Sequence, residues 1–288
     1  PKFFNRLYIS SRHRKKFFLN KLPKQARIYI TADDYYKLYI NEKFIGQGPA
    51  PGYPSHYPYN VFDITAYLQT GKNVLAVHTL YQGLINRVWV SGDLRHGLLC
   101  DVELDNCLLF GSDTSWLTQV HSGYTESDVV GIQTQFMETY DSNSPEIGFE
   151  KIFYDDSDWE ECKFCQYDDH VFSEQKVSPL VFEEVRPKGM SHHNRTTLID
   201  FGAVFAGYLS VSAFGNKGDQ IIVRCGDELN EDGSLRYQMR CNCTYEEKWI
   251  LSDGCSRLQW FDYKAFRYVE LLLPEGVRLD ESQIFITA

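Results

Sequence analysis

The chain has 288 residues, and its 29 Lys and Arg residues against 39 Asp and Glu residues give a net charge of −10. This acidic balance argues against nucleic-acid binding by the chain as a whole, so we expect no nucleic-acid partner. No run approaches the roughly 18 consecutive apolar residues that a membrane helix needs, so we expect no membrane partner. The length predicts about two domains, and the 15% of aromatic residues is typical of β-strands and of sugar-contacting surfaces.

Basic residues are concentrated at the start of the chain. Residues 1–30 hold nine Lys and Arg and no acid, with Arg12, Arg14, Lys15 and Lys16 close together. One interpretation is an arm that contacts nucleic acid or an anionic membrane. The other, which we favour, is a solvated edge strand whose charges discourage association between strands.

The first elements in chain order are strands. Apolar and polar residues alternate through residues 27–41, which predicts a pair of half-buried strands, with a hairpin turn at Asn41 and Glu42. Residues 46–59 contain four prolines and three glycines and are predicted to form a loop, not a central strand. A short helical turn follows at residues 63–68, where Asp63 can cap the N-terminus.

Strands are next predicted at residues 74–80, 98–104 and 107–110, and long loops with short strands at about 138–165. A second unit starts after residues 187–190. Its predicted strands cover residues 197–201, 208–214, 220–225, 245–251, 258–261 and 266–273. The fold class is therefore all-β, with two β-sandwich domains in series at residues 1–187 and 188–288.

Eight cysteines include Cys162 and Cys165 in a CxxC arrangement, and Cys241 and Cys243, which would share one face of a strand. A zinc site needs two such pairs, or one pair with suitably spaced histidines. The thiols are therefore interpreted as free and mostly structural, with no metal or other cofactor. Reduced thiols favour a cytoplasmic location without excluding secretion.

The candidate ligand-binding residues are aromatic and polar. Tyr53, His56, Tyr57 and Tyr59 lie among prolines that restrict their loop, and such rings suit the apolar faces of sugars. The alternative is that these rings pack beneath the loop or against a neighbouring domain. Trp89 and Arg95 belong to a second polar and aromatic cluster, for which a buried structural network is the favoured interpretation. The acidic pairs are interpreted as caps and turns, so no catalytic residue is assigned.

Several of these stretches resemble the N-terminal, non-catalytic region of bacterial α-L-rhamnosidases of glycoside hydrolase family 78. They are residues 32–41 (ADDYYKLYIN), 48–52 (GPAPG), 63–65 (DIT), 71–77 (GKNVLAV), 89–95 (WVSGDLR), 154–159 (YDDSDW), 200–202 (DFG), 218–219 (GD), 228–229 (EL) with 232–233 (DG), and 261–270 (FDYKAFRYVE). The ordered set covers nearly the whole chain. Glu42, where the family usually has Gly in its hairpin, is a small departure.

The resemblance implies two jelly-roll sandwiches of the galactose-binding-like kind. It also implies that the general acid and base lie on an α/α barrel following the second sandwich, a catalytic domain that this chain lacks. The parent enzyme would cleave terminal α-L-rhamnose with inversion, so a rhamnose-containing glycan is a possible partner. An autonomous carbohydrate-binding module is the alternative.

Overall fold

The computed structural model describes residues 8–53, 55–84, 96–131, 134–144, 146–165, 170–178, 180–240 and 243–288. Strands dominate, and the single short helix in these ranges is η1 (Thr65–Tyr67), so the all-β prediction is confirmed. None of the described helices has the length and apolar character to cross a membrane. The chain forms two compact units, residues 1–121 with 146–180, and residues 122–145 with 181–288.

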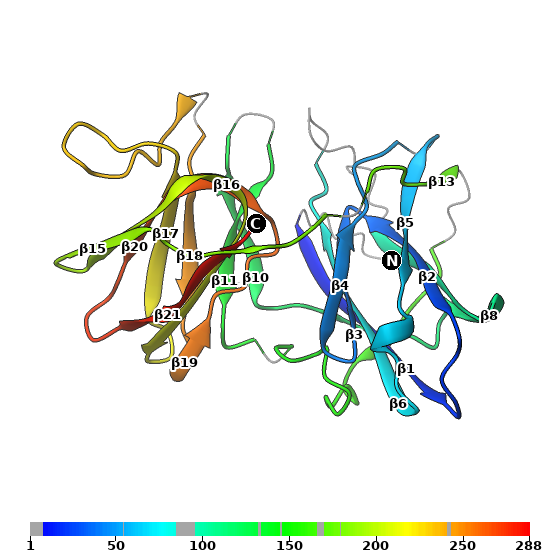
Figure 1. Cartoon of the computed structure of the whole chain (residues 1–288). Helices are drawn as coiled ribbons and strands as arrows, with labels where there is room; N and C mark the ends of the chain where they lie inside the picture. The colour runs from blue at the N-terminus through cyan, green and yellow to red at the C-terminus, as the bar shows by residue number, and fades with distance from the viewer. Residues whose placement is uncertain are drawn as a thin grey trace. The chain divides into compact units, whose positions relative to one another are not determined.

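The first unit is a sandwich of two sheets (Figure 1). Across the six-stranded sheet, the order is β12 (Glu160–Glu161), β9 (Leu117–Val120), β1 (Ile9–Leu19), β6 (Gly71–Tyr81), β3 (Tyr35–Ile40) and β4 (Lys43–Gly48). Across the five-stranded sheet, it is β13 (Phe172–Glu174), β5 (Tyr57–Asp63), β2 (Ala26–Asp33), β7 (Gly97–Leu104) and β8 (Cys107–Gly111). Both sheets contribute to one core, for example Ile28 from β2, Leu38 from β3 and Val77 from β6.

The two strands predicted at residues 27–41 exist, but they lie in different sheets. β2 pairs with β5 and β7, whereas β3 pairs with β4 and β6. The hairpin prediction holds, because Asn41 and Glu42 have φ values of 48° and 73° at the turn between β3 and β4. The predicted helical turn is the 3-10 turn η1, and the Asp63 carboxylate accepts the Thr65 N–H at 2.9 Å.

The loop predicted at residues 46–59 is shorter than expected, because Tyr57, Pro58 and Tyr59 begin the internal strand β5. Pro58 can occupy this position although it has no N–H to donate. The flanking Tyr57 N–H donates to the Val171 carbonyl, and the Thr31 hydroxyl donates to the Pro58 carbonyl at 2.8 Å. These two hydrogen bonds, one from a side chain and one from the neighbouring parallel segment, therefore replace part of the backbone hydrogen bonding that the proline interrupts.

The basic residues near the N-terminus do not form a solvated edge, so that prediction is wrong. β1 lies between β9 and β6, and the Arg12 and Arg14 residues are 3% and 1% exposed. Arg14 Nε donates to Asp156 Oδ2 at 2.8 Å, and the Arg12 guanidinium lies 4.4 Å from the centre of the Phe149 ring. The segment that follows β11 therefore covers this face of the sheet, and its Asp156 carboxylate pairs with Arg14.

The second unit contains a single connected sheet path of β10 (Tyr124–Val129), β11 (Phe136–Asp141), β18 (Glu246–Ile250), β17 (Gln220–Gly226), β20 (Lys264–Leu272), β16 (Thr196–Gly215), β21 (Arg278–Thr287) and β14 (Glu184–Val185). β15 (Gly189–His193) and β19 (Gly254–Arg257) pair with β16 off this path. The 20 residues of β16 merge two predicted strands. Its pairing with β20 is irregular between Asp200 and Phe205, and such irregularities allow a strand to bend.

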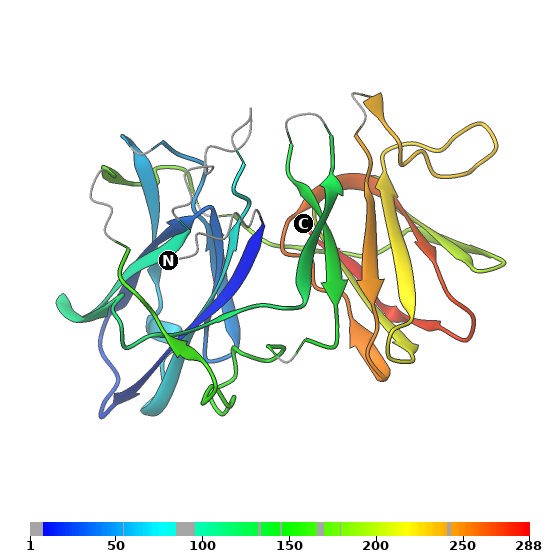
Figure 2. The same cartoon turned by 180° about the vertical axis from the view of Figure 1, so that it is seen from behind.

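Two features of this unit differ from the sequence prediction. The strand expected at residues 258–261 lies instead at β19, while Leu258, Trp260 and Phe261 are buried without being in a strand. In addition, β10 and β11 join the second unit, as the green strands beside the orange β18 in Figure 2 show. Trp249 Nε1 also donates to Ser142 Oγ at 2.8 Å. Long-range pairing of this kind places residues 122–145 with the second unit, whereas the sequence suggested one division at residue 187.

Candidate functional site

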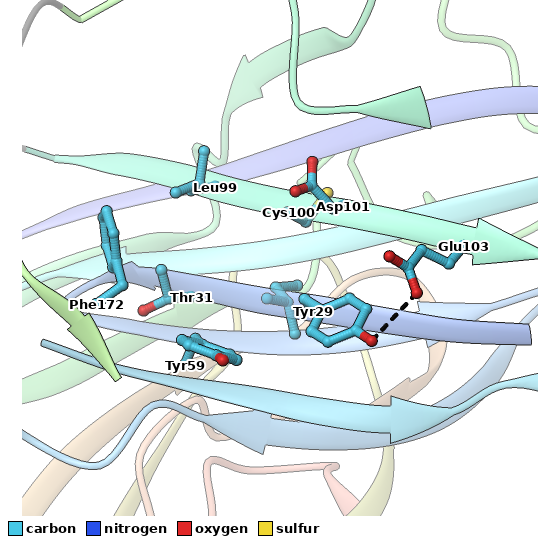
Figure 3. Close-up of a pocket in the computed structure, with 9 residues that line it drawn as sticks. Tyr29, Thr31, Tyr59, Leu99, Cys100, Asp101, Glu103 and Phe172 are labelled. Atoms are coloured by element: carbon cyan, nitrogen blue, oxygen red, sulfur yellow. Dashed lines mark hydrogen bonds between the residues drawn. The ribbon is translucent and has the colours of Figure 1, made fainter. Parts of the chain in front are cut away.

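A pocket of about 430 Å³ opens on the outer face of the five-stranded sheet in the first unit. Figure 3 shows its main features: the rings of Tyr29 and Tyr59, the exposed Leu99 and Phe172, and the carboxylates of Asp101 and Glu103. The complete lining set is Tyr29, Ile30, Thr31, Tyr59, Leu99, Cys100, Asp101, Glu103 and Phe172.

Strand alternation places these side chains on one face. Ile28 and Ile30 of β2 point into the core, so Tyr29 and Thr31 point outward. On β7, Cys100 and Val102 are buried, so Leu99, Asp101 and Glu103 share the outer face. The antiparallel register sets Tyr29 opposite Asp101 and Thr31 opposite Leu99, which brings the two rows together.

The short strand β13 supplies one wall of the pocket. It pairs in parallel with β5, with Phe172 opposite Tyr57 and Glu174 opposite Tyr59. The Gln175 N–H donates to the Tyr59 carbonyl at 2.8 Å and fixes this pairing. Phe172 is 45% exposed and Leu99 is 47% exposed, so the pocket has apolar walls in contact with solvent.

Hydrogen bonds within the pocket leave it rich in acceptors. The Tyr29 hydroxyl donates to Glu103 Oε2 at 3.1 Å, and the Thr31 hydroxyl donates to the Pro58 carbonyl. Both hydroxyl protons are therefore already used, while the Tyr29 oxygen and the Asp101 carboxylate can accept. Among the residues that the structure describes as lining this pocket, none is Lys or Arg.

Of the described residues predicted to bind a ligand, only Tyr59 lines the pocket. Tyr53 is 65% exposed and lies outside it. The Tyr57 hydroxyl donates to the Ala32 carbonyl at 3.1 Å from a buried position, which makes Tyr57 a packing residue. His56 Nε2 lies 3.2 Å from Ser173 Oγ, at the start of the pocket wall. Trp89 and Arg95 lie outside the described residues.

Of the nine lining residues, only Tyr59 was identified from the sequence. Five of the eight missed residues give the pocket its polar and aromatic character: Tyr29, Thr31, Asp101, Glu103 and Phe172. A signal existed for four of them, because aromatic and acidic residues alternate with buried apolar ones in two predicted strands. What the sequence could not supply was that these two strands are neighbours. Phe172 lies in a strand of three residues, which is too short to show a period.

A second polar cluster is buried in the first unit. His13 Nε2 lies 3.0 Å from Thr79 Oγ1, which lies 3.0 Å from His96 Nε2. Burial lowers the pKa of His13 to about 3 and that of His96 to about 4, so both imidazoles are neutral at neutral pH. Cys162 Sγ lies 3.9 Å from His13 Nδ1, but burial raises the pKa of this thiol to about 11. A protonated thiol beside a neutral imidazole is not an activated nucleophile.

The second unit buries a cluster of charged groups. Lys264 Nζ lies 3.0 Å from Glu247 Oε1, and both side chains are 3% exposed. Glu138 accepts the backbone N–H groups of Phe261 and Asp262 at 3.0 and 3.3 Å. Burial raises the pKa of Glu247 to about 7. These carboxylates are bound by internal donors in a buried position, which suits a structural network and not substrate contact.

Two models of known protein families match this chain. The model of the α-L-rhamnosidase N-terminal domain matches residues 21–184, which is more than half of the chain. The chain belongs to this family. The model of the bacterial α-L-rhamnosidase concanavalin-like domain matches residues 191–283. The predicted resemblance to α-L-rhamnosidases is therefore confirmed, and it covers both sandwiches.

Similar proteins are much longer than this chain. An α-L-rhamnosidase of Streptomyces avermitilis is 22% identical over 88% of the chain, which covers 26% of that protein. One from Formosa agariphila is 24% identical over 92% of the chain, covering 30% of that protein. The chain thus spans between a quarter and a third of the length of these curated relatives.

Solved structures share the fold. The α-L-rhamnosidase of Dictyoglomus thermophilum matches 98% of the chain and 33% of its own, with 25% identity and a TM-score of 0.77. A family 78 rhamnosidase of Bacillus sp. GL1 matches 99% of the chain and 55% of its own, with 13% identity and a TM-score of 0.87. The chain therefore has the β-sandwich architecture found in these rhamnosidases.

Proposed function

We propose that this chain is a non-catalytic part of a bacterial protein that removes terminal α-L-rhamnose from glycosides with inversion. In this proposal the general acid and base belong to a catalytic domain outside residues 1–288. The support is the match of both sandwiches to rhamnosidase domains, together with the small share of the relatives that these domains represent. A rhamnose-containing glycan is then the substrate of the whole protein.

The arrangement of the pocket carboxylates is the observation that carries the non-catalytic assignment. Inversion needs one carboxylate on each side of the sugar ring, about 6.5–9.5 Å apart, with room for a water molecule on one side. Asp101 and Glu103 are alternate residues of one strand, so both project from the same face. They approach a ligand from one side only and cannot serve as opposed acid and base.

The direct test is hydrolysis of 4-nitrophenyl α-L-rhamnopyranoside by this chain. We expect the rate to equal that of buffer, because the two carboxylates among the described pocket residues, Asp101 and Glu103, lie on one side of the site. Sequencing the reading frame beyond Ala288 provides the second arm, in which we expect a helical region carrying two separated acids. Turnover by residues 1–288 alone would overturn the proposal.

A carbohydrate-binding module is the second candidate function. The pocket on the outer face of the five-stranded sheet favours it, because tyrosine rings and carboxylates line this pocket. Both functions are compatible in one chain, because an accessory domain can bind sugar without breaking a bond.

A further inference from the structure

We infer that the pocket bounded by Tyr59, Leu99, Asp101, Glu103 and Phe172 is a binding site for a neutral pyranose. This inference rests on the second candidate function, carbohydrate binding at the same pocket, and it concerns binding and not hydrolysis. Three features of the pocket support it: the shape of its walls, the polarity of its hydrogen-bonding groups and the charge of its lining residues.

The walls suit a ring with an apolar face. Tyr29 and Tyr59 have their ring centres 6.3 Å apart at an interplanar angle of 54°, so their rings form a bent surface. Leu99 and Phe172 stand exposed at the pocket. A pyranose offers a C–H face that packs on such rings, and the volume of about 430 Å³ falls within the range of small-ligand sites.

The hydrogen-bonding groups select for a ligand that brings several donors. Tyr29 uses its hydroxyl proton on Glu103, so its oxygen can accept from a ligand. Thr31 is buried and uses its proton on the Pro58 carbonyl, so it does not donate to the pocket. The two carboxylates also accept. Asp101 and Glu103 are two residues apart on β7, and so about 7 Å apart along the strand. Hydroxyl groups at separate positions of a sugar ring can reach both, whereas an ammonium group concentrates its donors at one point.

The charge of the lining excludes acidic sugars. Two carboxylates face the pocket, and the described lining residues include no Lys or Arg to offset them. A uronate would bring a third negative charge into a site that offers mainly acceptors, which is unfavourable on both counts. The pocket therefore distinguishes neutral pyranosides from their acidic counterparts.

The experiment is calorimetric titration of this chain with four probes. They are methyl α-L-rhamnopyranoside, methyl β-D-galactopyranoside, D-galacturonate and D-glucosamine. We expect at least one neutral pyranoside to bind at millimolar concentration and D-galacturonate to bind at least tenfold more weakly. Failure of both neutral probes, or tighter binding of the uronate or the amino sugar, would overturn the inference.

Variants then locate the binding. Tyr59→Ala should lower the affinity for the neutral probe by about tenfold, the loss expected for a stacking aromatic ring. Asp101→Asn, on an exposed side chain, provides a second variant whose folding is not in question and should lower it severalfold. In the double variant Asp101→Asn/Glu103→Gln, the difference in affinity between the neutral probe and D-galacturonate should become smaller, because the two repulsive charges are removed.

The matched control is Tyr53→Ala, which removes an exposed tyrosine of the neighbouring loop outside the pocket. We expect it to leave affinity unchanged. Loss of binding in Tyr53→Ala with retention in both Tyr59→Ala and Asp101→Asn would assign the ligand to the loop and overturn the inference. A hydrolysis assay on the same samples tests the non-catalytic proposal separately. Absence of hydrolysis supports that proposal whether or not the titration detects binding.

Discussion

Each compact unit buries an ion pair, but the other ionisable groups buried with it differ between the two units. In the first, Arg14 is paired with Asp156 beneath a covering segment, and His13 and His96 are kept neutral by burial. In the second, two carboxylates, Glu138 and Glu247, share a buried site with Lys264. Both units are β structures with apolar cores, so the difference lies in the polar groups that accompany each core. It should appear as different responses of the two units to mutation and to pH.

The largest expected effect comes from breaking the buried pair of the second unit. Lys264→Met leaves Glu247 and Glu138 buried without their cation, and removal of one partner from such a pair costs about 3–5 kcal/mol. Urea unfolding followed by hydrogen exchange of the second unit measures this cost. The Lys264 pKa is raised because the charges of Glu247, Glu138 and Asp262 outweigh the effect of burial, so the cation is present at every pH used.

The control is the double variant Lys264→Met/Glu247→Leu, which removes the charge of both partners. Replacement of a buried ion pair by apolar residues is often close to neutral, so most of the lost stability should return. A single-variant cost below about 1 kcal/mol would contradict the assignment of this cluster as a structural network.

The next prediction compares the stability cost of losing a buried ion pair with that of losing an exposed one in the first unit. Arg14→Met should cost about 2–3 kcal/mol, because the Arg14 side chain is fully buried and Asp156 loses its buried partner. Lys16 pairs with the same carboxylate but is about half exposed, so Lys16→Met should cost less than about 1 kcal/mol. Equal costs in urea unfolding of the two variants would contradict the importance of burial at this site.

The pH dependence of stability should have opposite signs in the two units. Between pH 7 and pH 5 unfolded imidazoles take up protons near pH 6.5, whereas folded His13 and His96, with pKa values of about 3 and 4, do not. Acidification therefore destabilises the first unit, by about 1–2 kcal/mol for each imidazole. Folded Glu247, with a pKa of about 7, takes up its proton earlier than the unfolded side chain, so acidification stabilises the second unit.

Hydrogen exchange resolved by unit, with intrinsic exchange rates corrected for pH, measures both signs in one sample. His13→Gln should reduce the acid sensitivity of the first unit and leave the second unchanged. The opposed pH dependence would be refuted if protection in both units changed in the same direction between pH 7 and pH 5.

The smallest expected effect concerns the pocket. Tyr29→Phe removes the hydroxyl that donates to Glu103, a partly exposed bond, and should cost less than about 1 kcal/mol in urea unfolding. The same variant frees Glu103 to accept from a ligand instead. A cost above about 2 kcal/mol would show that this bond belongs to the structural core and not to a solvent-facing site.

Local signals in the sequence predicted local structure well. The turn at Asn41 and Glu42 and the 3-10 turn after Asp63 are set by neighbouring residues, so both could be found without knowledge of the fold. Partners far apart in the chain could not. Arg14 was interpreted as solvated because nothing near it shows that Asp156 covers it, and residues 122–145 gave no sign that they join the second unit.

The candidate site follows the same rule. Tyr59 was found because aromatic residues among prolines stand out, but Tyr57 in the same stretch is buried. Asp101 and Tyr29 appeared as ordinary outward residues of two strands. Only the register between those strands turns them into neighbours with Glu103, and register depends on the packing of the whole sheet.

The measurement that tests the account most directly is single-turnover incubation of a large excess of this chain with 4-nitrophenyl α-L-rhamnopyranoside. We expect release of nitrophenolate at the buffer rate, both for the chain and for its Asp101→Asn/Glu103→Gln variant. Release that depends on the chain and is lost in the double variant would show that these two carboxylates break the glycosidic bond, and that the sandwiches are themselves catalytic.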